Sequence, residues 1–445
     1  MSKRNWTLTC VFCLLALIGL LPACSNEGTA ELPADVPEAV ETELTRPPTS
    51  RPFPSSTLAP SDTATPDITP TLTIAVTTSS NGTVSHLPSG TSLTFRKLWM
   101  MDSEQGWALG GENREDTQLF RTADGGTTWQ DVTPPEQVEA SGLMDAAAFF
   151  LDDETGWFVY QRIPSPDGFL APMVWRTDDG GESWVASEPL DVSGFMGFYG
   201  PSRIGFSDQL HGWLMLDLDA AMMHRYIAIY TTNDGGASWT RVVDPTSDAP
   251  IQTGDKTGLV MDVEGRGLMT RDLHGLTPEI TVEITRDGGR TWESVVLDVP
   301  AVDSGVQQLC AAHSPALFSA LSWRVGVSCV VFNDEGNTGD DPWLSGEAYL
   351  FRTEDGGITW ERFDSPGGEQ IYFDGDVVLS LGREIYRSDD GGLTWSYRRT
   401  VNWDAVFSFI SPDTGWAAAY NQGESALVWT ENGGETWQAL YPVVR

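Results

Sequence analysis

The stretch Thr122-Ala-Asp-Gly-Gly-Thr-Thr-Trp129 decides the fold, because the chain contains six further copies of its pattern. Each copy has Thr or Ser first, Asp or Asn third, then a Gly-Gly pair, and Trp last. The other copies begin at Thr177, Thr232, Thr285, Thr353, Ser388 and Thr430. An eight-residue pattern that recurs at intervals of 35 to 68 residues indicates a repeat architecture.

The pattern is typical of a tight turn between two strands. The third residue accepts backbone N–H groups inside the turn, and the two glycines supply positive φ without steric cost. The Trp starts the returning strand and packs between neighbouring sheets. We therefore interpret the third residues and the tryptophans as structural, not as catalytic or metal-binding groups. They are Asp124, Asp179, Asp234, Asp287, Asp355, Asp390 and Asn432, with Trp129, Trp184, Trp239, Trp292, Trp360, Trp395 and Trp437.

A second repeat, ending in Gly-Trp, precedes four of these turns, at 102–107, 152–157, 207–213 and 411–416. With the β-rich runs around it, each unit reads as four short strands. Seven such units over residues 93–445, about 50 residues each, predict an all-β fold, a seven-bladed β-propeller of four-stranded antiparallel blades. Six or eight blades are the alternatives, because the fourth to sixth units lack the Gly-Trp pair.

These two repeats resemble known families. The eight-residue turn resembles the Asp-box, or bacterial neuraminidase repeat. Its alternation with Asp-x-x-x-Gly-Trp resembles the photosystem II assembly and stability factors and their relatives in non-photosynthetic bacteria. The resemblance implies a non-enzymatic propeller, so we expect no enzyme but a binding or assembly scaffold for an envelope or secreted protein. Family members that act on the photosystem use an arginine-rich surface, and this acidic chain gives no reason to carry over that partner.

The competing interpretation is a sialidase-like or other glycoside hydrolase, or a carbohydrate-binding propeller. Arg162-Ile163-Pro164 matches the Arg-Ile-Pro motif that supplies one of the three substrate-binding arginines in sialidases. In sialidases this motif opens the first blade, whereas here it falls in a loop of the second. No other member of the sialidase site can be assigned by spacing, so we name no catalytic residue.

The propeller topology predicts which face carries function. Connections between the first and second strands and between the third and fourth are tight and repetitive; we call their side the turn face. The other connections, on the loop face, include the irregular segments 161–172, 217–225, 270–279 and 333–347. Loops held by a rigid scaffold are where binding groups concentrate. The candidate residues on them are Arg162, Met223, His224, Arg225, His274, Asp334, Asp340, Asp341 and Trp343.

Each of these loops also has a simpler interpretation. The segment 222–225 fits a packed loop as well as a partner-binding one. The run 333–341 is rich in oxygen ligands but lacks an EF-hand register, which favours a solvated acidic loop over a calcium site. Trp343 fits either a stacking platform for a sugar or peptide, or a lid over this loop. We expect no metal and no cofactor.

The charge balance restricts the partners. The chain has 63 acidic and 26 basic side chains, a net charge of −37. Such a surface repels phosphate backbones and anionic lipids, so nucleic acid is not an expected partner. Because apolar residues make up 40% of the chain, a large core is available.

The N-terminus predicts export and membrane anchoring. Lys3 and Arg4 precede an apolar run over 8–21, which has the size of a signal-peptide core. Its end, Leu21-Pro22-Ala23-Cys24, resembles the lipobox of bacterial lipoproteins, which implies cleavage after residue 23 and lipidation of Cys24. An ordinary cleaved signal and a retained anchor helix are the alternatives. We thus expect the protein on the extracytoplasmic side of a bacterial envelope. Residues 24–92, rich in Pro, Thr and Ser, predict a disordered linker.

Cysteine usage agrees with export. Besides Cys10 and Cys13 in the signal and Cys24 at the anchor, the chain has Cys310 and Cys329. An even remainder in an oxidising compartment predicts a disulfide between them, with two buried free thiols as the alternative.

Overall fold

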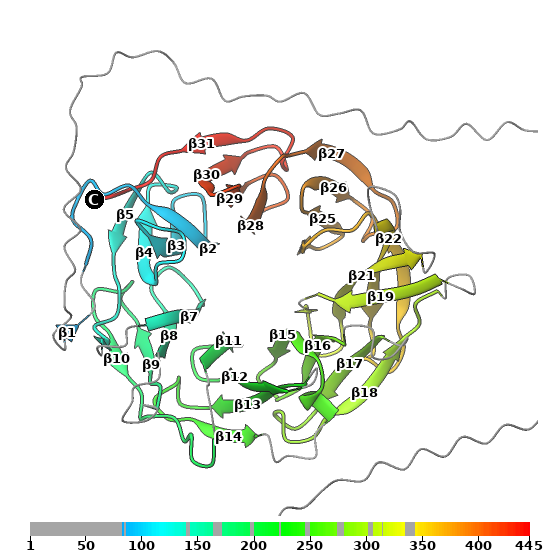
Figure 1. Cartoon of the computed structure of the whole chain (residues 1–445), viewed down its shortest axis with the longest axis horizontal. Helices are drawn as coiled ribbons and strands as arrows, with labels where there is room; N and C mark the ends of the chain where they lie inside the picture. Colours follow the sequence, from blue (N-terminus) through cyan, green and yellow to red (C-terminus); the bar gives the residue numbers. More distant parts are fainter. Residues whose placement is uncertain are drawn as a thin grey trace, which may run out of the picture. The chain divides into compact units, whose positions relative to one another are not determined.

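In the described part of the chain, seven four-stranded β-sheet units form a ring (Figure 1). This computed structural model describes residues 82–83, 86–138, 143–162, 171–195, 200–221, 224–244, 250–273, 280–300, 306–313, 315–333 and 343–445. They all belong to the compact unit Ala75–Arg445. The predicted seven-bladed β-propeller is confirmed. The signal peptide, Cys24 and most of the predicted linker lie outside the described residues.

Each blade is an antiparallel meander that runs outward from the centre of the ring. Blade 1 contains β2 (Thr94–Met100), β3 (Gln105–Gly111), β4 (Gln118–Ala123) and β5 (Thr128–Asp131). Blade 2 contains β7 (Leu143–Phe150), β8 (Gly156–Arg162), β9 (Val174–Thr177) and β10 (Val185–Ala186). Blade 3 contains β11 (Gly200–Phe206), β12 (Gly212–Ala221), β13 (His224–Thr232) and β14 (Thr240–Val243). Blade 4 follows a 3-10 turn, Pro250–Gln252, and contains β15 (Asp255–Met261), β16 (Gly267–Asp272), β17 (Ile280–Thr285) and β18 (Glu293–Leu297).

The last three blades continue the ring. Blade 5 contains β19 (Val306–Ala312), β21 (Trp323–Asn333), β22 (Trp343–Thr353) and β23 (Glu361–Ser365), with a short β20 (Ala316–Leu317) paired to β21. Blade 6 contains β24 (Gln370–Asp374), β25 (Val377–Leu381), β26 (Glu384–Ser388) and β27 (Ser396–Thr400). Blade 7 contains β28 (Asp404–Phe409), β29 (Gly415–Asn421), β30 (Glu424–Thr430) and β31 (Gln438–Leu440). A single backbone pair, Asp272 with Ala311, joins blades 4 and 5.

Every Gly-Gly turn is held by the same hydrogen bonds. In the first, Asp124 Oδ1 accepts the N–H of Thr128 at 2.9 Å, and its Oδ2 accepts the Thr128 hydroxyl at 2.7 Å. The Thr122 hydroxyl donates to Asp124 Oδ1 and accepts the N–H of Gly126. Gly125 and Gly126 have φ of 71° and 99°, which a residue with a Cβ rarely adopts. The third residues of the other six turns accept in the same way.

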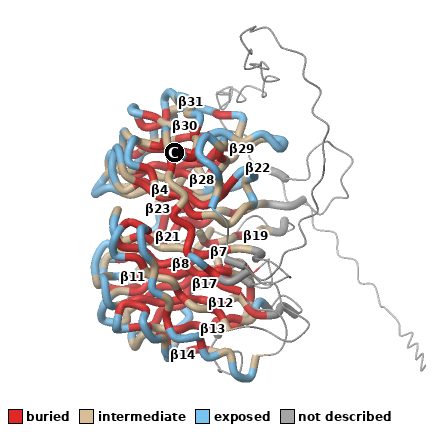
Figure 2. The backbone as a smooth tube through the Cα atoms, turned by 90° about the vertical axis from the view of Figure 1, so that its left-hand side faces the viewer, coloured by how far each residue is buried: buried red, intermediate tan, exposed pale blue. Residues whose placement is uncertain are grey.

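The tryptophans of these turns lie in the seams between blades. Trp129 is fully buried and packs with Phe95 of its own blade and Trp416 of blade 7. The second strands are apolar over consecutive residues, as in Trp157, Phe158 and Val159, because a blade has neighbours on both of its faces. Figure 2 accordingly shows buried segments (red) along the strands and exposed ones (pale blue) at the turns.

The C-terminus closes the ring on the outer edge of blade 1. The terminal strand β32 (Val443–Val444) runs parallel to β5, with Val444 paired to Trp129. On its other side, Gly90 donates to the Val444 carbonyl at 2.7 Å, and Val444 donates to Thr91 at 2.9 Å. Residues 86–92, which we assigned to the linker, thus pack on blade 1. Farther upstream, β1 (Gly82–Thr83) pairs with β6 (Gln137–Val138).

Blade 5 carries a disulfide. Cys310 on β19 and Cys329 on β21 face each other in register and are joined by an S–S bond of 2.01 Å. The bond closes a loop with a sequence separation of 19 residues. Among the described residues no helix is long and apolar enough to cross a membrane.

Candidate functional site

Basic side chains gather on blades 1, 3 and 4, mostly on the two innermost strands, although acidic residues outnumber basic ones in the chain by 63 to 26. Two of the three lysines in the sequence, Lys97 and Lys256, are among them. Figure 1 shows β2, β11 and β15 on the inner side of the ring. These first strands follow connections of the loop face, so residues in their first halves lie toward that face. We define the cationic cluster as Arg96, Lys97, Arg203, Arg225, Lys256 and Arg271.

In blade 1 the cluster reaches across the seam to blade 2. Arg96 Nη1 lies 2.6 Å from Asp145 Oδ1 on β7, and Lys97 Nζ donates to the Ala146 carbonyl at 3.3 Å. Burial lowers the pKa of Lys97, and the nearby Arg96 and Arg203 lower it further, while Asp145 opposes them. Within the described residues, Arg96 Nε and Nη2 are buried without a hydrogen-bond partner. The Arg96 side chain as a whole is 12% exposed, so part of it is open to a ligand.

In blades 3 and 4 the cluster is built around Lys256, which is 7% exposed. Its ammonium donates to the carbonyls of Arg225 at 2.6 Å and Gly254 at 2.7 Å, and Arg203 Nη2 donates to the Lys256 carbonyl at 3.3 Å. Burial, with Arg271 nearby, lowers the pKa of Lys256 to about 7. The carbonyl acceptors favour its ammonium form against this desolvation.

Carboxylates on the same and neighbouring strands balance part of this charge. Arg225 lies 3.1 Å from Asp217 Oδ2 and 3.0 Å from Asp255 Oδ1. Arg271 pairs with the fully buried Glu283, which also accepts the Ser294 hydroxyl at 2.6 Å. Six basic groups thus stand among five acidic ones: Asp145, Asp217, Asp255, Glu283 and Asp272, which is paired in register with Asp255. The cluster is a local excess of positive charge in an acidic molecule.

Of the predicted loop residues, only Arg225 is described with its side chain, and it belongs to the cluster. Arg162, His224 and Trp343 lie in β8, β13 and β22, but their side chains are outside the described residues. Met223, His274, Asp334, Asp340 and Asp341 lie outside them altogether.

Our sequence reasoning missed the rest of the cluster. We looked for function on the irregular loops, whereas Arg96, Lys97, Arg203 and Lys256 interrupt the innermost strands themselves. A usable signal was present in the sequence: two of only three lysines fall within first strands that are otherwise mainly apolar or small.

The fold places the chain among the β-propellers. No family model matches the sequence. A curated relative, a xyloglucanase from Paenibacillus sp, is 24% identical over 207 residues, which are 41% of this chain and 19% of the relative. The chain thus spans about a fifth of the length of that relative.

Solved structures with the same architecture include YCF48 bound to D1 peptide, at 18% identity over 79% of this chain and 94% of that one, with a TM-score of 0.45. They also include the GH74 enzyme of Niastella koreensis, at 13% identity over 78% of this chain and 62% of that one, with a TM-score of 0.35. At these levels the likeness concerns the fold alone.

The prediction that the chain is not an enzyme is contradicted by the curated relative, which is a xyloglucanase. We had based that prediction on the repeats, whose residues hold turns and therefore specify only the scaffold. A propeller scaffold is compatible with either role, since activity resides in particular side chains and not in the fold.

Proposed function

We propose that this chain is a lipid-anchored, extracytoplasmic propeller that binds an envelope or secreted protein through its loop face. In this proposal, acidic side chains of the partner contact the cationic cluster. The observation that carries it is Arg96, whose Nε and Nη2 are buried without a partner in the described part of the chain. Leaving a buried donor unsatisfied costs about 1–3 kcal/mol, and more for a charged group. A carboxylate of the partner would remove that cost through charge-assisted hydrogen bonds.

The net charge of −37 does not oppose this binding at contact distance. At physiological ionic strength exposed charges are screened beyond about 8 Å, whereas partly buried charges are screened much less. A carboxylate that reaches Arg96 and Lys97 therefore experiences mainly the local excess of positive charge. Long-range repulsion would slow the encounter with acidic partners and so favour those with a matching local arrangement.

The anchor is part of the proposal. The Leu-Pro-Ala-Cys motif ending at Cys24 supports lipidation at that cysteine. A flexible chain the length of segment 24–81 would have a root-mean-square reach of roughly 40 Å, enough to hold the propeller away from the membrane. Labelling cells with palmitate tests the anchor: label on wild type and none on Cys24→Ala supports it, and equal labelling refutes it.

Crosslinking in the native envelope tests the binding proposal. We expect one specific protein to be captured by the wild type and to be captured more weakly by Arg96→Gln. Arg399→Gln on the outer strand β27 is the matched control and should capture as the wild type does. Capture that is the same for Arg96→Gln as for the control would refute a role for the cluster.

A second candidate function is β-glucan hydrolysis, and the observation that favours it is the xyloglucanase relative. Glycoside hydrolases usually place two carboxyl groups around the scissile bond. Asp145, Asp217 and Asp255 supply carboxylates beside the cluster. If this candidate holds, the protein releases reducing ends from xyloglucan, and Asp217→Asn or Asp145→Asn abolishes the release. Absence of turnover at high protein concentration would remove it.

A further inference from the structure

On the turn face, four of the seven blades have an arginine directly before the Gly-Gly turn: Arg121, Arg176, Arg352 and Arg387. It stands on the third strand, opposite the tryptophan of the Gly-Trp repeat: Arg121 is paired with Trp107 and Arg176 with Trp157. Each side chain extends toward the following blade. Arg121 reaches Asp153 of blade 2, and in blade 6 Arg387 reaches Asp413 of blade 7 at 2.8 Å. The arginine thus connects one blade to the first turn of the next.

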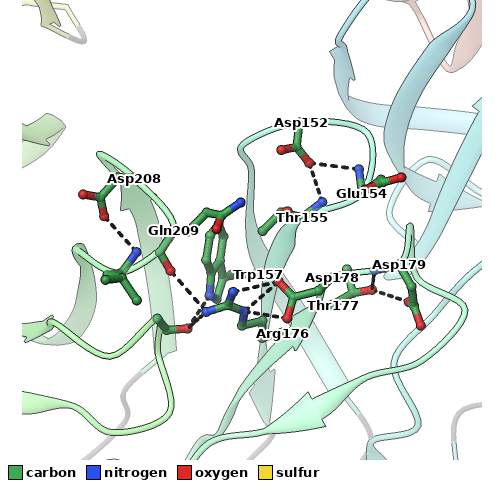
Figure 3. A network of polar contacts seen from close by, with 12 residues as sticks. Asp152, Glu154, Thr155, Trp157, Arg176, Thr177, Asp178, Asp179, Asp208 and Gln209 are labelled. Carbon is green, nitrogen blue, oxygen red and sulfur yellow. Dashed lines mark hydrogen bonds and ion pairs between the residues drawn. The ribbon is translucent and has the colours of Figure 1, made fainter.

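The seam between blades 2 and 3 shows the full set of contacts. The Arg176 guanidinium lies 5.3 Å from the centroid of the Trp157 ring, and its Nη1 donates to the carbonyls of Gln209 and Gly235 at 3.1 Å each (Figure 3). Its Nε and Nη2 donate to Asp178. A seam of this kind therefore offers a guanidinium an aromatic face and two carbonyl acceptors.

Blades 3, 4 and 7 have no arginine at this position but Thr231, Ile284 and Trp429. In blade 3 the smaller Thr231 is paired with Trp213. A pocket of about 380 Å³ lies at this position, between Trp213 and Thr231 on one side and the turns of blade 4 on the other. This volume is within the range of ligand-binding pockets. The pocket lies where an arginine side chain would lie in the neighbouring seam.

The acceptors of the seam are retained. In blade 3 the first glycine of the Gly-Gly turn is Gly235, and its N–H donates to the carbonyl of Leu210. Leu210 is the residue that follows Gln209. In blade 4 the equivalent glycine, Gly288, donates to the Gly265 carbonyl. Glu264 and Gly288 thus occupy the positions that Gln209 and Gly235 hold beside Arg176. Both line the pocket.

The charges around the pocket are mixed. Asp262, Glu264 and Asp287 line it, and so does Arg290, whose Nη1 donates to the Asp287 carbonyl at 2.8 Å. Arg266 lies 2.8 Å from both Asp262 and Glu264. His211, also in the lining, contacts Asp208. These three carboxylates outnumber the two arginines.

The surroundings of the pocket suit a protein ligand. Leu210 and Val263, on the first turns of blades 3 and 4, are about half exposed, at 51% and 50%. Further exposed apolar side chains occupy turns of blades 5 and 6 on the same face: Phe318, Leu321, Ile358 and Leu393. A partner segment that inserts a basic side chain can cover such residues at the same time.

We propose that the pocket between blades 3 and 4 binds the guanidinium of an arginine side chain presented by a basic segment of a partner protein. The arginine of the partner completes the seam as Arg176 does in the preceding one. This site is on the turn face and is independent of the loop-face proposal above.

The test uses Nα-acetyl-arginine methylamide as the probe and the indole N–H signals of ¹⁵N-tryptophan-labelled mature protein as the readout. We expect one indole signal to shift saturably as the probe is added. This signal should be missing from the spectrum of Trp213→Phe, which assigns it to Trp213. Thr231→Arg, which supplies the guanidinium from within the chain, should weaken probe binding at least tenfold. Thr231→Ala is the matched control and should bind as the wild type does. Arg96→Gln should also leave this binding unchanged.

Two further arms keep the proposal falsifiable if Thr231→Arg does not fold. Arg176→Thr should open the preceding seam, so that the probe shifts the Trp157 signal as well. The matching lysine derivative should bind at least tenfold more weakly, since an ammonium cannot stack on the ring and span both carbonyls.

Three outcomes would overturn the proposal. They are equal binding of the probe by Thr231→Arg and Thr231→Ala, equal binding of the arginine and lysine derivatives by the wild type, and binding of the probe only after Arg290→Gln.

Discussion

At the residue scale, the carboxylates of the repeated turns act as hydrogen-bond acceptors within their own turns. Asp355 accepts the N–H groups of Ile358 and Thr359 and the Thr359 hydroxyl. These bonds lower its pKa to about 2. Asn432 replaces Asp in the seventh turn and makes the equivalent bonds, accepting from Thr436 N–H and donating to its hydroxyl. The turn thus needs the acceptor geometry more than the charge.

This chemistry predicts sensitivity to acid. The carboxyl of Asp355 titrates at about 2 in the folded chain and at about 3.9 when unfolded. Its contribution to stability is therefore complete above about pH 5 and is lost progressively as the pH falls toward 2. Asp355→Asn should lose less stability than the wild type between pH 6 and pH 3 in urea unfolding. Identical losses in the two proteins would contradict the assigned role.

At the element scale, a blade is stabilised by its neighbours and, in blade 5, by a covalent bond as well. Cys310 and Cys329 are both buried, and their bridge ties the inner strand β19 to β21. The seam between blades 4 and 5 also includes a strand pairing of one residue, Asp272 with Ala311.

Removing the bridge should destabilise the propeller. For a loop of this length, loss of a disulfide costs about 2–4 kcal/mol. The double variant Cys310→Ala/Cys329→Ala should show this decrease in the free energy of unfolding. Wild type treated with a reductant serves as the control and should behave like the variant. Unchanged stability in both would mean that strand pairing alone determines the stability of the blade.

At the scale of the whole molecule, ring closure depends on the last residues of the chain. Val444 is buried between Thr91 and Trp129, and Arg445 donates to the Trp129 carbonyl at 2.9 Å. Trp416 of blade 7 also crosses this seam, because its indole N–H donates to the Gly125 carbonyl of blade 1.

A truncation that removes residues 442–445 should therefore open the seam between blades 7 and 1. We expect a lower melting temperature and faster hydrogen exchange in β2 and β5, with blades 3 and 4 little changed. Deleting the same number of residues from the predicted linker, at 61–64, is the control. Uniformly faster exchange around the ring, or none, would contradict local closure.

Much of the fold could be predicted because its turns are local. An Asp or Asn, two glycines and a Trp act over eight residues, so their pattern is visible in the sequence, and even the short blade 6 follows from it. The cationic cluster could not be predicted in the same way. Arg96 meets Asp145, and Arg203 meets Lys256, only after separate blades are arranged in a ring. The pocket beside Thr231 could be predicted in part, because the absence of an arginine at this position is visible once the repeats are aligned.

The central claim is that the cationic cluster binds acidic groups of a partner, and binding of a fluorescent hexaglutamate peptide tests it most directly. Despite the net charge of −37, the mature protein should bind this peptide saturably. Arg96→Gln/Arg203→Gln should weaken binding at least tenfold, since a hydrogen bond to a charged group is worth about 1.5–3 kcal/mol. Arg399→Gln should have no effect. An absence of binding, or equal affinity in all three proteins, would contradict the claim.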